Sequence, residues 1–106
     1  MGILYKGLHV KNATLEQLYN LFRHIGAKHL LIQTTTVGDI FEVDLVKTTY
    51  PLLHVATNTA TYSSGQLEYT FQLIVMDLVN KDESNEEEVL SDMLQVIGDV
   101  LSVLFN

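Results

Sequence analysis

Histidines and carboxylates are the side chains of this sequence best suited to chemistry, because it contains no cysteine. The four histidines are His9, His24, His29 and His54. Zinc sites hold their ligands at short spacing, such as two histidines four residues apart on one helix. His24 and His29 are five residues apart across an expected helix end, and the other two stand alone. We therefore expect no metal site.

The best candidate for paired carboxylates is the segment 38–44, GDIFEVD. Asp39 falls in an expected turn, while Glu42 and Asp44 share one face of an expected strand over residues 40–45. Two carboxylates can act as acid and base when their surroundings separate their pKa values. The flanking apolar residues supply the core face, so we expect a solvated polar face here.

Motifs for other enzyme chemistry are missing from the sequence. It contains no G-x-S-x-G nucleophile elbow and no glycine-rich loop that could cradle a phosphate. We therefore expect no catalytic residue, no cofactor and no enzyme activity.

Two helices are predicted near the ends of the chain. The first covers about residues 14–25, where Thr14 can cap the helix, Gln17 completes a capping box, and Gly26 supplies a stop. The second runs from about Glu86 to Leu104, after Ser84 or Asn85 as a cap, with acidic residues in its first turn.

Between the helices the chain is rich in residues that suit a pleated sheet. Strands are expected at 30–36, 40–45, 52–61 and 67–75, with Pro51 at a strand start because it lacks a backbone donor. The predicted fold is a single α+β domain over residues 1–106. It has a four-stranded, mainly antiparallel sheet with an N-terminal and a C-terminal helix packed on it.

The last helix carries two apolar stripes, which together are wider than one sheet requires. Either the helix lies in a thick core, or it is buried between subunits. In the second interpretation, one stripe forms the candidate subunit interface: Val89, Val96, Val100 and Val103. The other stripe comprises Leu90, Met93, Leu94, Ile97, Leu101 and Leu104.

Charge is divided unevenly along a chain whose net charge is −7. Residues 1–38 contain four Lys or Arg and one acid, whereas residues 80–106 contain seven acids and one lysine. Four scattered bases do not form a phosphate-neutralising footprint, so direct DNA binding is not expected. Neither a membrane span nor a signal peptide is apparent, which predicts an intracellular protein. The candidate lumen-lining or partner-facing acids are Asp82, Glu83, Glu86 and Glu87.

The order of these segments resembles the tail terminator, or tail completion, proteins of tailed bacteriophages and related neck-ring proteins. The resemblance covers nearly the whole chain. It depends on the order and the composition of the segments, with no catalytic signature. It is carried by residues 38–45 (GDIFEVDL), Tyr50-Pro51 opening the segment 52–55 (LLHV), the apolar strand 67–77, and the capped acidic helix 85–99.

The resemblance implies a virion protein that is assembled in the host cytoplasm. Such proteins form a ring, commonly of six subunits, that contacts tail tube or connector subunits and surrounds a channel through which DNA passes without specific binding. They have no cofactor, metal or active site. The alternative interpretations are a cytoplasmic adaptor that binds a protein through its acidic last helix, and a small-ligand protein, which would need a pocket with converging polar groups.

Overall fold

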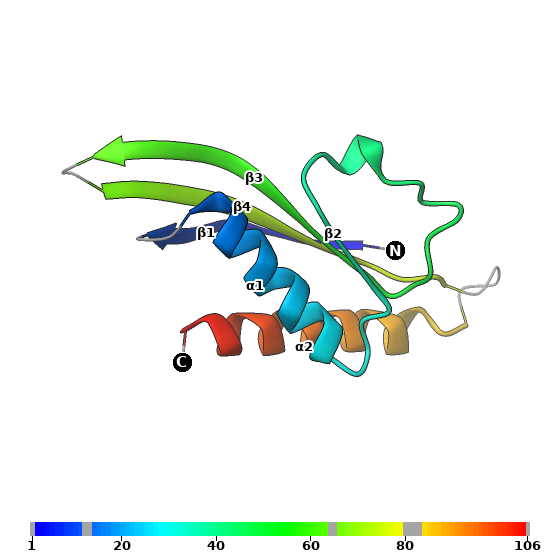
Figure 1. Cartoon of the computed structure of the whole chain (residues 1–106). Helices are drawn as coiled ribbons and strands as arrows, with labels where there is room; N and C mark the ends of the chain where they lie inside the picture. Colours follow the sequence, from blue (N-terminus) through cyan, green and yellow to red (C-terminus); the bar gives the residue numbers. More distant parts are fainter. Residues whose placement is uncertain (1, 12–13, 64–65, 80–83, 106) are drawn as a thin grey trace.

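The computed structural model describes residues 2–11, 14–63, 66–79 and 84–105. These residues form an α+β fold in which two helices pack on one mixed sheet (Figure 1). The elements, in chain order, are β1 (Gly2–Lys11), α1 (Leu15–Lys28), β2 (Thr34–Val37), the 3-10 helix η1 (Ile40–Glu42), β3 (Leu52–Ser63), β4 (Gln66–Met76) and α2 (Glu86–Phe105).

The sheet has the strand order β1-β4-β3-β2. β4 is antiparallel to both of its neighbours, β1 and β3, and β2 joins the outer side of β3 in parallel. The parallel β2–β3 pair is possible because residues 38–51 return the chain to the same end of the sheet. The expected α+β class is confirmed, but the sheet is mixed, and its strands are only partly those expected.

The prediction that the chain begins with a helix was wrong, because β1 precedes α1. β1 has a weak period-two signal, since apolar side chains lie on both of its faces. Ile3 and Tyr5 pack against the core, whereas Leu4 on the other face is 46% exposed. Without clear alternation, its sequence does not read as a half-buried strand.

The strand expected at residues 40–45 was also wrong. The chain leaves β2 at Gly38, whose φ of 101° is a conformation that glycine adopts without a Cβ clash. The Asp39 carboxylate then accepts a hydrogen bond from Phe41 N at 2.9 Å and so begins η1. Phe41 is 93% exposed, so the apolar residues of this segment do not form a core face.

Both predicted helices are confirmed. The Thr14 and Gln17 capping box is present in both directions, at 3.1 Å and 2.9 Å. However, Gly26 does not end α1, which continues to Lys28. Gly26 is buried instead, at a close approach between α1 and Thr35 of β2.

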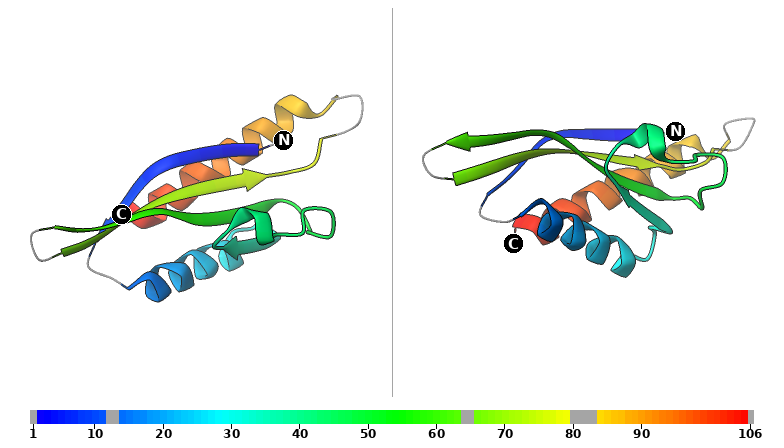
Figure 2. Two further views of the ribbon diagram at one scale, coloured as in Figure 1. Left: turned by 90° about the horizontal axis from the view of Figure 1, so that it is seen from above. Right: turned by 45° about the horizontal axis from the view of Figure 1, so that its top comes forward.

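The core lies between one face of the sheet and the two helices, with α1 against β2 and β3, and α2 against β4 and β1 (Figure 2). Its centre is Phe71 of β4, whose ring meets Phe22 of α1 edge-on at a centroid distance of 5.3 Å. The β3–β4 hairpin continues past the helices as a curved arm (Figure 1). The register shifts once in each strand that flanks β4, at Gly7 of β1 and at Asn58 of β3.

Candidate functional site

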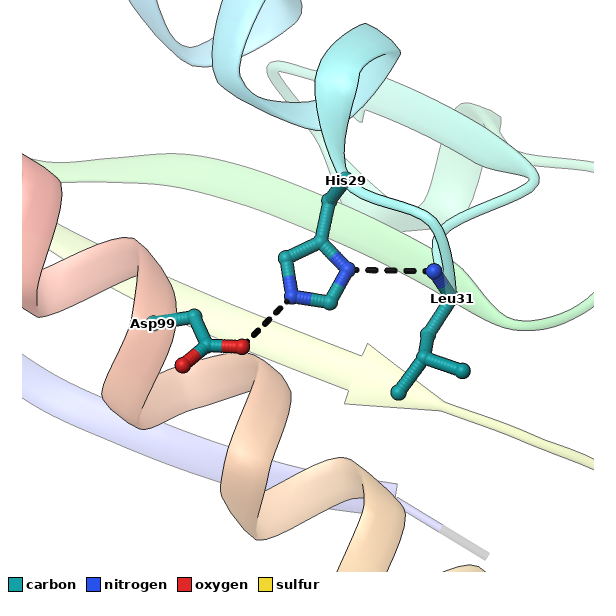
Figure 3. Close-up of polar contacts among 3 residues, drawn as sticks. All are labelled: His29, Leu31 and Asp99. Carbon is teal, nitrogen blue, oxygen red and sulfur yellow. Dashed lines mark hydrogen bonds and ion pairs between the residues drawn. The ribbon is translucent and has the colours of Figure 1, made fainter.

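His29 and Asp99 form the arrangement most similar to a catalytic pair among the described residues (Figure 3). His29 is the C-cap of α1, and Asp99 lies on α2, so the contact joins the two helices. His29 Nε2 lies 2.9 Å from Asp99 Oδ2, and Leu31 N lies 3.1 Å from His29 Nδ1. A backbone N–H can only donate, so Nδ1 is the acceptor and the neutral ring carries its proton on Nε2.

This arrangement leaves His29 without a free basic nitrogen. In a catalytic triad, the carboxylate orients one ring nitrogen while the other receives the proton of the nucleophile. Here the Leu31 amide occupies the nitrogen that would act as the base. The pair therefore acts as a clasp between the turn after α1 and the middle of α2.

A hollow of about 260 Å³ lies beside this clasp. Its volume is below the roughly 300–1,000 Å³ of typical small-molecule pockets. Its lining combines apolar and basic side chains with the clasp itself: His24, Ile25, Lys28, His29, Asp99 and Val103.

His54 is a fully buried histidine on the other face of β3. Its Nε2 donates to the Gly38 carbonyl at 2.8 Å, so Nδ1 accepts from the Thr36 hydroxyl at 2.7 Å. Desolvation by burial lowers the pKa of His54, which keeps the ring neutral. With both nitrogens occupied, His54 ties the start of the 38–51 loop to the sheet and is not placed to move protons.

The carboxylates of segment 38–44 have local structural roles. Asp44 Oδ1 accepts hydrogen bonds from Val46 N and Lys47 N, much as Asp39 caps η1. Together with Glu42, they line an open basin of about 540 Å³. Within the described residues, no three His, Cys, Asp or Glu side chains lie close enough together to hold a metal ion.

The valine stripe proposed as a subunit interface requires correction. Val89, Val96 and Val100 are at most 6% exposed and belong to the monomer's own core, whereas Val103 is 61% exposed. The buried face of α2 combines these valines with Met93 and Ile97 of the other stripe, whereas Leu90 and Leu94 of that stripe are exposed. Only Val103 of the four is available to a partner.

The candidate acidic residues divide into two groups. Asp82 and Glu83 lie outside the described residues. Glu86 is half-buried and Glu87 is exposed in the first turn of α2, where negative charge suits the helix N-terminus.

The surface that sequence reasoning missed is the outer flank of α2. Asp99 faces α1, and at about 100° per residue Leu90 and Leu94 lie roughly 180° and 140° around the helix from it. This flank points away from α1, on the side where α2 packs beneath β1. Leu90 is 38% exposed and Leu94 is 55% exposed. The leucine spacing was visible, but the sequence alone does not say which stripe faces the sheet.

Comparisons with known proteins do not assign the chain to a family. No family model, curated protein or solved structure gives a significant match to this chain.

In the part of the chain that the structure describes, no helix has the length and apolar character needed to cross a bilayer.

Proposed function

We propose that this protein is a non-enzymatic structural subunit of a ring at the tail terminus or head–tail neck of a tailed bacteriophage. In this proposal, several copies surround the channel through which DNA passes and contact tail tube or connector subunits. The observation that carries the proposal is the exposed outer flank of α2, with Leu90 and Leu94, on the helix that packs against the edge strand β1. Adjacent exposed aliphatic side chains commonly mark a protein interface.

The charges of the two helices support contact between identical copies. α2 carries five acidic residues and no Lys or Arg, and its exposed Glu87 lines a surface hollow next to Leu90. α1 carries Arg23 on the opposite side of the molecule, where it lines a hollow with Gln33 and Thr35 of the β2 region. A head-to-tail contact between copies would bring the acidic flank of one against Arg23 of the next.

The order of the elements also supports the proposal. The resemblance rested on a Tyr-Pro pair opening a strand, a hairpin into a long apolar strand, and an acidic helix. Tyr50 and Pro51 directly precede β3, β3 pairs with β4 in an antiparallel hairpin, and α2 follows. An excess of negative charge suits a channel wall along which DNA slides, because basic residues would hold its phosphates.

Light scattering after size exclusion, over a series of protein concentrations, tests the proposal. We expect a defined species of several subunits, or a concentration-dependent rise toward one. Leu94→Asp should reduce the assembled fraction at least tenfold, since burying a new carboxylate in an apolar contact costs well over about 1.4 kcal/mol. Gln95→Asp is the matched control, because it adds the same charge at an exposed position outside the leucine flank.

Circular dichroism should show that Leu94→Asp retains its helices, since Leu94 is 55% exposed. Val96→Asp should instead unfold the monomer, because Val96 is 1% exposed. A native protein that is monomeric at every concentration would contradict a self-assembling ring and would favour the adaptor function. Equal assembly of Leu94→Asp and Gln95→Asp would show that the outer flank is not an interface.

A further inference from the structure

The sheet has two free backbone edges on opposite sides. β1 is an edge strand of ten residues that pairs only with β4 among the described strands. On the other side, β2 pairs with residues 52–55 of β3 and no further. The rest of β3, residues 56–63, has β4 on one side and none of the described strands on the other. Unpaired strand edges are templates for pairing with another chain.

The second edge is open because Gly38 turns the chain out of the sheet. Gly38 N still donates to the Val55 carbonyl at 2.9 Å, as the last contact of β2 with β3. Its positive φ then directs the chain into η1, away from the line that β2 would have followed. That line, beside residues 56–63, is where an additional strand would fit.

Only the β3 edge lacks the usual protection against pairing by proline or charge. Natural edge strands are commonly blocked by proline or by charged side chains. β1 contains no proline but carries Lys6 and Lys11, whereas residues 56–63 (ATNTATYS) contain neither proline nor charge. The exposed side chains here are the small Thr59, Ala60 and Thr61 and the aromatic Tyr62.

The directions of the two edges are compatible with a ring. β1 and β3 both run antiparallel to β4, so they run in the same direction. Rotation about an axis that lies roughly along the strands keeps this direction in every copy. β1 of one copy would therefore meet β3 of the next as a parallel pair, and the contact would repeat around a closed cycle.

We propose that β1 of one subunit pairs in parallel with residues 56–63 of β3 in a second copy, joining the sheets of neighbouring subunits. The partner is a second copy because one chain supplies both edges, of similar length and equal direction. The two helices also differ in charge, with five acids and no Lys or Arg on α2, which packs on β1, and Arg23 on α1, which packs on β2 and β3. This inference rests on the proposed ring and specifies its subunit contact.

Cysteine cross-linking tests the contact directly, because the native chain has no cysteine. Leu4 and Lys6 lie on the sheet face away from the helices, since their neighbours Ile3 and Tyr5 pack against the core. Thr59 and Thr61 lie on that same face, because they pair with Thr70 and Glu68, which alternate with the core residues of β4. The four combinations of Leu4→Cys or Lys6→Cys with Thr59→Cys or Thr61→Cys sample different registers.

A cross-link within one chain is excluded for the pair Lys6 and Thr61. Lys6 is level with Gln72 and Ala56, and Thr61 lies five residues beyond Ala56. Because Thr61 pairs with Glu68, four residues from Gln72, two strand spacings of about 4.8 Å and four steps of about 3.3 Å separate the two residues by roughly 16 Å. Disulfides need Cα atoms within about 7 Å, so any disulfide must join two molecules.

The double variant Lys6→Cys/Thr61→Cys is oxidised, or treated with a short bis-maleimide, and run on a denaturing gel. We expect a ladder from dimer up to the ring size in at least one of the four double variants. Two single variants, one with its cysteine on β1 and the other with its cysteine on β3, are then mixed, and one of the two carries a size tag. Cross-linked heterodimers should exceed the proportion expected from random pairing.

Two results would overturn the proposed contact. Predominant homodimers of a β1 single variant would indicate a symmetric pairing of β1 with β1. A defined multi-subunit mass together with no ladder in any of the four double variants would show that the ring forms by another contact. That second result leaves the proposed function standing, whereas a monomeric protein at every concentration removes both.

Discussion

Replacing Gly26 with alanine tests how α1 is seated on the sheet. A Cβ at Gly26 would overlap Thr35 Oγ1 and would stand 2.9 Å from Thr35 Cβ and 3.1 Å from Thr35 Cγ2. Rotating the Thr35 side chain does not relieve the contact with its Cβ, which is fixed to β2. The helix or the strand must therefore move.

The expected magnitude combines two opposing effects. Glycine in a helix is less favourable than alanine by about 0.5–1 kcal/mol, so the substitution gains that amount from helix propensity. Overpacking a core costs about 1–3 kcal/mol and occasionally more. We expect Gly26→Ala to lower the free energy of unfolding by about 1–2 kcal/mol.

Gly98→Ala is the matched control, because Gly98 lies inside α2 and a Cβ there meets no atom within 4 Å. It should raise the free energy of unfolding by about 0.5–1 kcal/mol through propensity alone. Guanidinium unfolding followed by circular dichroism measures both variants, and the difference between them isolates the clash. If Gly26→Ala stabilises the protein as much as Gly98→Ala, the close packing of α1 on β2 is refuted.

Two further predictions concern the histidines. Burial lowers the pKa of His54 from its ordinary 6.5, so below that pH the unfolded chain accepts a proton that the folded chain resists. Stability should therefore be full above pH 6.5 and fall as the pH drops, and the unfolding midpoint should fall less steeply in His54→Gln between about pH 8 and about pH 5. Asp99 is 49% exposed, so Asp99→Asn should lower the free energy of unfolding by a measurable amount below about 1 kcal/mol in a guanidinium titration, and an unchanged free energy of unfolding would contradict the clasp role of the pair.

Local sequence patterns predicted an element reliably where a single local effect, such as helix capping or hydrophobic periodicity, determines it. The capping box at Thr14 and the 3.6-residue periodicity of both helices located α1 and α2 closely. The long alternating pattern of β4 located its strand, and Pro51 did lie directly before β3.

The sequence could not identify features that depend on packing between elements. The 40–45 segment has strand-like composition, yet an aspartate cap and a positive-φ glycine give it a different conformation. The two stripes of α2 are equally periodic, and only the seating of α2 on the sheet shows that its buried face takes Val89, Val96 and Val100 from one stripe and Met93 and Ile97 from the other. Likewise, the clasp joins His29 and Asp99 across 70 residues, and no local pattern predicts such a contact.

The paired register shifts at Gly7 and Asn58 have a consequence for how this chain can tolerate changes in length. Both shifts fall beside Phe71 at the centre of the core, where each flanking strand accommodates one extra residue, and the arm lies beyond the buried Tyr69 of β4. In the arm, the described β3 residues Thr59 to Tyr62 are exposed. The length of the arm is therefore limited mainly by the pairing of β3 with β4, and little by side-chain packing. Adding or removing two residues in each strand of the hairpin would preserve which side chains face each way. The reach of the arm can thus be altered without redesigning the core, which makes it the natural place to adapt this fold to a larger or smaller assembly.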